Sequence, residues 1–383
     1  VLADVAILDA CAHIPAIELL SIIGRVQQVV VIAHCATVTS ESVKQLIDTL
    51  PHIEVDAAPS RRAPRLSAFL ESEGYGPVRY DVATEPAAGE VRFHRVEASG
   101  VPVMSSGLVE SSQPEIDEVV RLITQRAAGF AVVPSSYRLV VVMLTDAFRT
   151  RLGAELKSLA GKSKAMGRFL RHVRLVSLRD VAGGRATDVI LSMCYAKTTH
   201  GRLLQQFGPL ESTGGLLLDA LALADHSLDI VSAFGSEDLD EERLHQSGPR
   251  FLKTMLTWAE QLDDRPVLPL RDAAGGNVLF DDIADRLRAR GLNAAVDYGF
   301  DKGVKIPLVV GLKDKPFALA VQTDDANFMS VQSTRRRHRL SAQDLISLGW
   351  NVMTVWSVAA FVNPDKEVDR IVSRIGEIYR EVE

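Results

Sequence analysis

The stretch VRLVSLRDVAGGRATDVILSMCYA, residues 173–196, contains two short apolar runs that are rich in Val, Ile and Leu. Runs of this length and composition are typical of strands buried in a parallel sheet. Similar runs lie on either side, and helical patterns separate them. The predicted strands there are FAVVP (130–134), LVVVML (139–144) and LDIVSAF (228–234), and the predicted helices are 115–127, helices within 146–172, 214–225 and 251–262. This alternation predicts one α/β domain over residues 115–262.

The N-terminal residues show the same alternation on a smaller scale. VAILDA (5–10) and VVVIA (29–33) are predicted strands, and apolar residues at helical spacing lie between them. Residues 1–50 are therefore predicted to form a β-α-β piece. Residues 51–114 are rich in Pro, Gly and Ser and have weaker periodicity, which predicts a connecting region with some short strands.

A linker is predicted at 263–277, where DDRPVLPLRDAAGG combines Pro, Gly and charged residues. The alternation then resumes. The predicted elements are helix 278–290, strands 293–300, 305–312 and 316–324, helix 334–347, strand 351–357 and helix 364–382. The predicted fold class is thus α/β, with parallel-sheet domains followed by a smaller α/β domain at 278–383.

Composition excludes several classes of protein. The chain has 383 residues, of which 47% are hydrophobic and 24% charged, so it is neither disordered nor fibrous. No apolar run reaches the roughly 18 residues of a membrane helix, and we expect no membrane partner. Three widely spaced cysteines favour a reducing compartment, which predicts the cytoplasm. The chain starts at Val1 inside a predicted strand, so we expect it to be part of a longer protein.

Charge is unevenly distributed, although the net charge is only −6. Residues 149–185 hold ten Lys or Arg against two acidic residues, whereas residues 205–264 hold twelve acidic residues against three basic ones. The basic stretch predicts a nucleic-acid contact, because clustered cations neutralise phosphates. The alternative is a solvated helix pair that docks on the acidic segment of the same chain. The cations favoured for nucleic-acid binding are Lys162, Lys164, Arg168 and Arg171.

Residues 1–50 resemble the end of the first motor domain of superfamily 1 helicases, a RecA-like fold. In that family an apolar strand leads into Asp-Glu-Ala-Ser/Ala and then Gln-Ile-Pro, and VAILDACAHIPAIELL fits this frame. The resemblance places Asp9 on the magnesium-binding Asp and Ala10 on the Glu that activates water. AHCATV (33–38) stands where the family has its nucleotide-sensing Gly-Asp-Pro-Lys-Gln-Leu. The resemblance therefore implies a nucleotide site that has lost two of its functional groups.

Residues 175–234 resemble the second motor domain of the same family. DVILS (188–192) and THGRLLQQFGPL (199–210) match the family closely, whereas AGGRA (182–186) replaces its Gln-Gly-Asp/Glu-Glu motif. LDALALADH (218–226) places Ala224 or a neighbour where the family has its arginine finger. The family's Walker A loop lies upstream of these segments and does not occur here. We therefore expect no cofactor in this part, with ATP and Mg²⁺ needed only if a longer protein is active.

The last hundred residues resemble the very-short-patch-repair-like endonuclease domain that some of these helicases carry. The matching segments are KIPLVV (305–310), AVQTDDANFM (320–329), TRRRHRLSAQDLISLGW (334–350) and VWS (355–357). Pro307, Gln322 and Met329 replace the family's first Asp, its Glu and its His, whereas Asp324 remains, beside Asp325 in place of Gly. Cleavage needs two or more acidic ligands on Mg²⁺, so no metal site is predicted.

Four arginines begin the predicted helix at 334–347. These residues are Arg335, Arg336, Arg337 and Arg339. Guanidinium groups match phosphate geometry, which predicts contact with a nucleic-acid backbone. The alternative is a helix face paired with nearby Asp residues such as Asp324, Asp325 and Asp344.

A further arrangement of metal-ligating residues follows the first two predicted strands. Cys11 and His13 follow one strand, and His34 and Cys35 follow the next. Two Cys and two His can hold zinc, but this spacing is geometrically poor, so packed or exposed side chains are the favoured interpretation.

The leading hypothesis is a catalytically degenerate helicase–nuclease relative that acts as a scaffold and binds DNA or RNA, or a protein partner. The second hypothesis is an active ATP-dependent helicase or nuclease whose ATP-binding loop lies upstream. The third is a pure protein-interaction module in which the basic and acidic segments bind each other or a partner.

Overall fold

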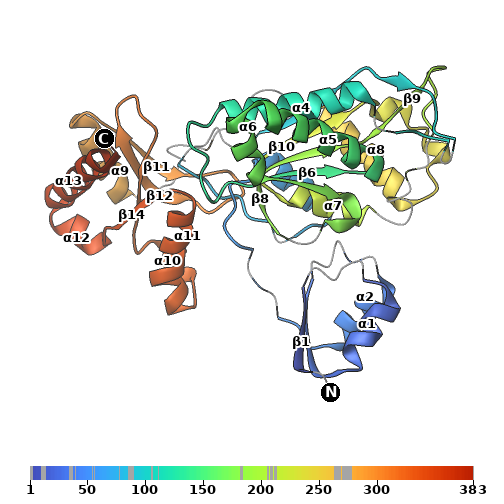
Figure 1. The fold of residues 1–383 in the computed structure, drawn as a ribbon. Helices are drawn as coiled ribbons and strands as arrows, with labels where there is room; N and C mark the ends of the chain where they lie inside the picture. The colour runs from blue at the N-terminus through green and yellow to red at the C-terminus, as the bar shows by residue number, and fades with distance from the viewer. Residues whose placement is uncertain are drawn as a thin grey trace. The chain divides into compact units, whose positions relative to one another are not determined.

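The computed structural model describes residues 3–9, 14–33, 38, 40–53, 55, 57–76, 78–84, 90–104, 107–110, 112–181, 184–204, 207, 210, 214–262, 269 and 278–382. It divides into two compact units, each built from several segments of the chain. Figure 1 colours the chain by residue number. The first unit is Val1–Val55, Ala68–Pro77 and Glu90–Asp264, and the second is Asp56–Ser67, Val78–Gly89 and Arg265–Glu383. Parts of the predicted connecting region thus cluster with the C-terminal residues. Among the described residues, every helix is too short or too polar to span a bilayer.

The N-terminal residues form a small β-α-β-α piece. Its elements are β1 (Ala3–Asp9), α1 (Ala16–Ile23), β2 (Val26–Ile32) and α2 (Glu41–Thr49). The two strands are parallel, with Asp9 opposite Ile32 at their carboxyl ends. Leu8, Leu19 and Val43 form a compact apolar cluster between the sheet and the helices. The predicted strand–helix–strand order of this piece is confirmed.

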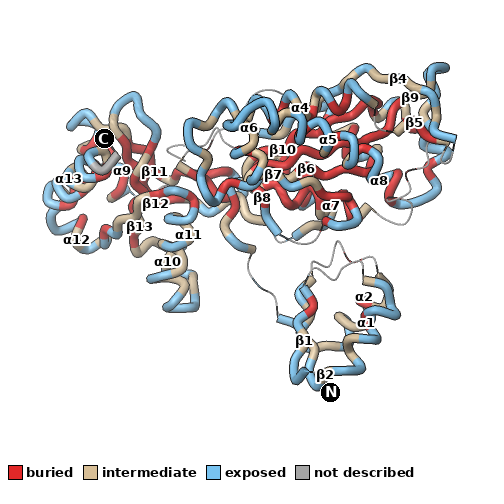
Figure 2. Tube along the Cα trace, viewed as in Figure 1, coloured by how far each residue is buried: buried red, intermediate tan, exposed pale blue. Residues whose placement is uncertain are grey.

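A five-stranded parallel sheet forms the centre of the first unit, in the order β3-β10-β8-β6-β7. The strands are β3 (Val91–Arg95), β6 (Leu139–Met143), β7 (Val173–Ser177), β8 (Ala186–Ser192) and β10 (Ala224–Ser232). Their apolar residues are buried, as Figure 2 shows for β6, β8 and β10. Burial on both faces explains why these strands are continuous apolar runs.

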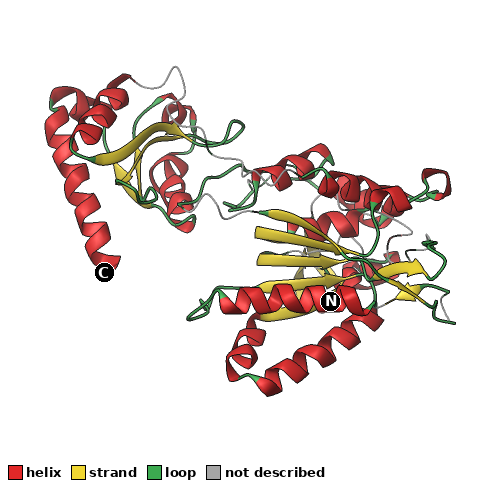
Figure 3. Ribbon diagram, turned by 90° about the horizontal axis from the view of Figure 1, so that it is seen from above, coloured by secondary structure: helices red, strands yellow, loops and turns green. Residues whose placement is uncertain are grey.

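Helices cover both faces of this sheet (Figure 3). The helices of the unit are α3 (Pro64–Ser72, shared with the second unit), α4 (Gln113–Ala128), α5 (Asp146–Lys162), α6 (Lys164–Phe169), α7 (Gly215–Ala222) and α8 (Ser247–Glu260). Helices α4, α5 and α6 contact one another, as do α7 and α8. Short 3₁₀ helices are η2 (Leu170–His172), η3 (Leu178–Asp180), η5 (Ser236–Asp238) and η6 (Glu241–Arg243). In α4, Ile116, Val119 and Ile123 lie on one buried face at helical spacing.

Three details of the first unit differ from the sequence predictions. FAVVP (130–134) forms no strand, and Val132 is 84% exposed. The run TDVILSMCYA forms two strands, because Cys194 takes a left-handed φ of 67° just after β8. The second strand, β9 (Tyr195–Thr198), belongs to a separate sheet with β4 (Ser99–Gly100) and β5 (Val109–Glu110). The predicted helix 214–225 ends at Ala222, so Ala224 lies in β10 opposite Ala186.

The second unit contains a four-stranded sheet in the order β11-β12-β13-β14. Its strands are β11 (Leu292–Tyr298), β12 (Ile306–Leu312), β13 (Leu319–Gln322) and β14 (Asn351–Thr354). The first two pairings are antiparallel and the last is parallel. Its helices are α9 (Val278–Ala289), α10 (Ala326–Ser330), the π-helix η7 (Arg336–Leu340), α11 (Ser341–Ser347), α12 (Ser357–Val362) and α13 (Pro364–Val382).

Two apolar clusters cover the two faces of this sheet. Helices α9 and α13 pack on one face through residues such as Phe280, Ile371 and Ile375. Val82 and Ala83 pack on the other face with Trp350, whose indole Nε1–H donates to the carbonyl of Val82 at 2.7 Å. The predicted fold class, α/β with a parallel sheet followed by a smaller α/β domain, is confirmed.

Candidate functional site

The carboxyl end of β13 places Asp324 beside the start of α12. One carboxylate oxygen of Asp324 accepts from the Ser357 backbone N–H at 2.7 Å, and the other accepts from the Ser357 hydroxyl at 2.9 Å. Partial burial alone would raise the pKa of Asp324, but these hydrogen bonds hold that pKa below its usual value. An unpaired N–H at the start of a helix is satisfied in this way, so Asp324 acts as a helix cap.

A second acidic residue, Asp297, lies within electrostatic range of Asp281 and Asp325. Asp297 lies in β11 at a left-handed φ of 48°, between the paired residues 296 and 298, and therefore opposite Pro307. Proline has no backbone N–H, so Pro307 cannot donate a ladder hydrogen bond at this point of β12. Burial and the charges of Asp281 and Asp325 raise the pKa of Asp297, whereas the charge of Lys305 opposes that rise.

The residues present do not fit the magnesium site that the endonuclease resemblance implies. Pro307, Gln322 and Met329 offer no carboxylate, and both oxygens of Asp324 are bonded to Ser357. The carboxylate of Asp325 accepts from the Phe328 N–H at 2.7 Å and caps α10. Over the described ranges, no three His, Cys, Asp or Glu side chains are close enough to hold a metal ion. We therefore derive no metal-assisted step at this end of the sheet.

The four predicted arginines lie on and just before the π-helix η7. Arg335 and Arg339 are exposed, whereas Arg336 and Arg337 are half-buried. Arg336 lies 4.0 Å from Asp344, measured from Nη2 to Oδ2, and the guanidinium of Arg337 lies 5.8 Å from the centroid of the Phe328 ring. The helix predicted at 334–347 is thus confirmed, with a π-helical first part. Turns of this type are frequent at functional sites.

Three rings from three separate segments of the chain meet beside Arg337. Phe328 of α10 is 5.2 Å from His338 and 5.9 Å from Trp356, between ring centroids, and His338 is 6.2 Å from Trp356. Trp356 is 43% exposed. We call the group of Phe328, Arg335, Arg337, His338, Arg339 and Trp356 the Arg–aromatic surface. Sequence analysis identified its arginines but not its rings, although an aromatic residue just before Met329 and the Trp of VWS were available signals.

The four cations predicted in the basic stretch lie at the corner between α5 and α6. Lys162 ends α5, Lys164 begins α6, and Arg168 and Arg171 follow in α6 and η2. All four are exposed, and no carboxylate of the described residues is within ion-pair distance of them. Arg149 of the same stretch does pair with Asp146, at 2.9 Å. The corner is therefore a solvated cationic surface.

The predicted nucleotide-site residues are only partly described. Asp9 is the exposed last residue of β1. Ala10, the Cys11–His13 and His34–Cys35 zinc candidates and most of the nucleotide-sensing segment lie outside the described residues, as do residues 182 and 183. The zinc arrangement therefore stays untested.

The polar residues buried in the five-stranded sheet form an ion-pair network below α4. Arg126 donates from Nε to Asp188 at 3.3 Å and pairs closely with Asp229. The imidazole of His94 lies 2.6 Å from the Asp229 carboxylate. Burial alone would raise the pKa of Asp229, but His94 and Arg126 lower it. All of these groups are used in packing, so the network is structural.

A buried carboxyl lies at the carboxyl end of β8. Glu115 Oε1 accepts from the Ser192 hydroxyl at 2.7 Å and from the Cys194 N–H at 2.8 Å. Burial raises the pKa of Glu115 to about 7, although these hydrogen bonds act in the opposite direction. Burial and the charge of Glu115 raise the pKa of the Cys194 thiol, which disfavours its thiolate form at neutral pH.

Comparison with known families bears on the C-terminal part of the chain. Residues 280–375 match the restriction-endonuclease-like family REase_MTES_1575. This match runs from α9 into α13 and includes the Arg–aromatic surface. It confirms the endonuclease-like nature of the C-terminal domain, and a domain of this type is suited to binding nucleic acid. The match does not reach residues 1–279, so the helicase resemblance stays a prediction. No curated protein is significantly similar to the chain.

Proposed function

We propose that this protein is a helicase–nuclease relative whose C-terminal domain binds nucleic acid without cleaving it. The observation that carries the proposal is the Arg–aromatic surface, in which a ring cluster contacts Arg337 and the exposed Arg335 and Arg339 lie two residues away along the same helical segment of an endonuclease-like domain. The engagement of Asp324 in capping α12 supports the loss of cleavage, because a carboxylate bonded twice to Ser357 is not available to a metal ion.

The two kinds of side chain supply different parts of the binding. The exposed guanidinium groups of Arg335 and Arg339 neutralise backbone phosphates, which gives affinity without sequence preference. The exposed ring of Trp356, which lies nearly perpendicular to that of Phe328, is available for stacking with a base. Stacking needs an unpaired base, so the surface favours single strands or opened duplexes over intact duplex.

The solvated corner formed by Lys162, Lys164, Arg168 and Arg171 is proposed as a second phosphate contact. Its cations have no carboxylate partners among the described side chains, so they are available to an external polyanion. Because it lies in the other compact unit, it is tested separately from the Arg–aromatic surface.

The test is a fluorescence-anisotropy titration of the whole chain with labelled single-stranded and duplex DNA over a salt series. The Arg335→Ala/Arg339→Ala variant should lose about 0.9 per removed phosphate contact from the slope of log affinity against log salt on duplex DNA, and somewhat less on single strands. A matched control, Lys313→Ala/Arg380→Ala, removes two exposed cations elsewhere in the same domain and should leave the slope unchanged.

Trp356→Ala separates stacking from charge. Loss of a stacked base costs about 1–3 kcal/mol, so single-stranded affinity should fall by roughly fivefold to 150-fold while the salt slope stays constant. Affinity that is unaffected by both the Arg and the Trp changes would exclude this surface. Cleavage of labelled DNA in Mg²⁺ by the unaltered chain would refute the non-cleaving part of the proposal.

A second proposal is that residues 1–50 and 115–262, which precede the endonuclease-like domain, retain motor activity in a longer protein. The position of Asp9 at the carboxyl end of a parallel strand favours it, because nucleotide sites lie at such ends. It predicts DNA-stimulated ATP turnover in the full-length protein that Asp9→Ala reduces. Equal ATP turnover with and without DNA would refute the proposal of motor activity.

A further inference from the structure

The outer edge of β14 is open in the described part of the C-terminal domain. β14 ends the sheet order and pairs only with β13 there. The backbone N–H groups of Asn351 and Val355 donate to Ala318 and Gln322, on the β13 side. Backbone groups alternate sides along a strand, so those of Val352 and Thr354 point to the open edge. An edge of this kind is a template for another strand.

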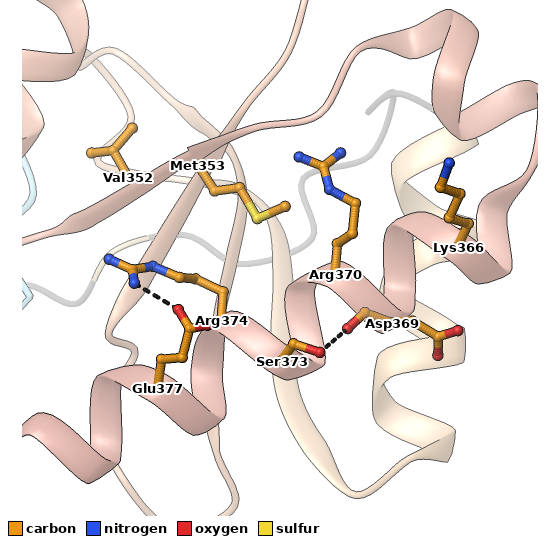
Figure 4. Close-up of a pocket in the computed structure, with 8 residues that line it drawn as sticks. All are labelled: Val352, Met353, Lys366, Asp369, Arg370, Ser373, Arg374 and Glu377. Carbon is orange, nitrogen blue, oxygen red and sulfur yellow. Dashed lines mark hydrogen bonds and ion pairs between the residues drawn. The ribbon is translucent and has the colours of Figure 1, made fainter.

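A groove runs between this edge and α13. It has a volume of about 510 Å³ and is lined on the strand side by Val352 and Met353. On the helix side, Lys366, Arg370 and Arg374 are four residues apart, so they lie on successive turns of one helix face. Figure 4 shows the side chains of Arg370 and Arg374 extending from α13 on the side of Met353.

The charges around this groove favour an acidic occupant. Asp369 pairs with Arg290, which directly follows α9, and Glu377 pairs with Arg374 at 2.8 Å. No carboxylate of the described chain lies within ion-pair distance of Lys366. A guanidinium has five N–H donors, and that of Arg374 is 38% exposed, so its single carboxylate partner leaves donors available.

We propose that the groove between β14 and α13 binds an extended acidic segment of a partner protein, which adds to β14 as a further strand. Strand addition satisfies the outward N–H and C=O groups of Val352 and Thr354, and alternate acidic side chains meet the cations of α13. A nucleic-acid backbone matches the cations but has no N–H donors for the strand carbonyls, so the open edge favours a peptide. The groove uses none of the residues of the Arg–aromatic surface and goes beyond nucleic-acid binding.

The test measures binding of the whole chain to a short labelled peptide in which Glu and Val alternate. A second peptide has the same sequence, but its alternate backbone nitrogens are methylated, so it keeps the charge and cannot pair as a strand. The Lys366→Ala/Arg374→Ala variant removes two groove cations and leaves Arg370, which pairs with the buried Glu367, in place. The Lys313→Ala/Arg380→Ala variant is the matched control, and thermal melting checks that each variant is folded.

The expected result is saturable binding of the parent peptide, about tenfold weaker binding to the groove variant, unchanged binding to the control variant, and no binding of the methylated peptide. Equal binding of the two peptides would overturn strand addition, as would an equal loss in the control variant or no binding at low salt. Displacement of the peptide by single-stranded DNA, with the same dependence on Lys366 and Arg374, would replace the proposal by a polyanion groove.

Discussion

Replacement of Asp324 by Ala tests whether this carboxylate serves as a helix cap. A residue that holds a catalytic metal usually costs stability, so its removal is neutral or stabilising. Asp324 instead bonds both the N–H and the hydroxyl of Ser357. Asp324→Ala removes both bonds. A capping hydrogen bond contributes about 1 kcal/mol to the free energy of unfolding, and a charged acceptor increases this value, whereas partial exposure to water reduces it. We therefore expect Asp324→Ala to lower the free energy of unfolding by about 1.5 kcal/mol.

The assay is thermal melting of the whole chain at neutral pH, with and without Mg²⁺. A loss of this size lowers the melting temperature of the C-terminal transition by about 4 °C. Asp324→Asn keeps one acceptor and should lose about half as much. Asp301→Ala, at an exposed loop position, is the control and should melt like the unaltered chain. The capping role is refuted if Asp324→Ala melts no lower than the control, or if Mg²⁺ stabilises the unaltered chain and not Asp324→Asn.

Three further predictions concern the interiors of the two units. Glu115 has a raised pKa, so the folded state favours its protonated form; stability should fall by about 3 kcal/mol between pH 5 and pH 8, and Glu115→Gln should flatten this profile in chemical unfolding. Arg126→Met leaves Asp229 without its arginine partner and should lower the free energy of unfolding by about 3–5 kcal/mol at pH 7. Because the pKa of Asp229 is depressed in the folded state, its contribution to stability is present above the pKa of the unfolded carboxyl and is lost as pH falls through the folded pKa. The stabilities of the variant and the unaltered chain should therefore converge in acid. Trp350→Phe leaves the buried Val82 carbonyl without its donor and should cost about 1–3 kcal/mol, and unchanged melting would show that water replaces the indole.

Sequence reasoning succeeded where burial alone sets the pattern. The strands from β6 to β14 that are buried on one or both faces are apolar runs, and their order along the chain could be predicted from these runs. FAVVP (130–134) has the same composition but lies exposed after α4 and forms no strand. The prediction was wrong there because the composition of a short segment does not show whether a partner strand is available. The connecting region was predicted to hold some short strands, and VRFHR (91–95) is one of them, but its polar residues hid its place in the sheet. Its polar His94 is held inside the sheet by Asp229, a residue distant in the sequence.

The candidate site shows the same division. Four clustered arginines are visible in the sequence, because charge needs no folding to be counted. The rings of Phe328, His338 and Trp356 come from three separate segments of the chain, and only the fold brings them together. The capping role of Asp324 is equally hidden, because the sequence of a strand end does not show which helix begins beside it.

The packing of Val82 and Ala83 under Trp350 has a consequence for how the C-terminal domain can be isolated. These two residues complete one face of its sheet, and Arg79 pairs with Asp344 at 2.9 Å in the same region. The family match begins only at residue 280. A protein truncated to that match would expose Tyr298 and Trp350 to water and would be prone to aggregate. Supplying residues 78–84 as a separate peptide should restore a soluble domain that melts cooperatively. Assembly of the truncated domain would then depend on addition of this peptide.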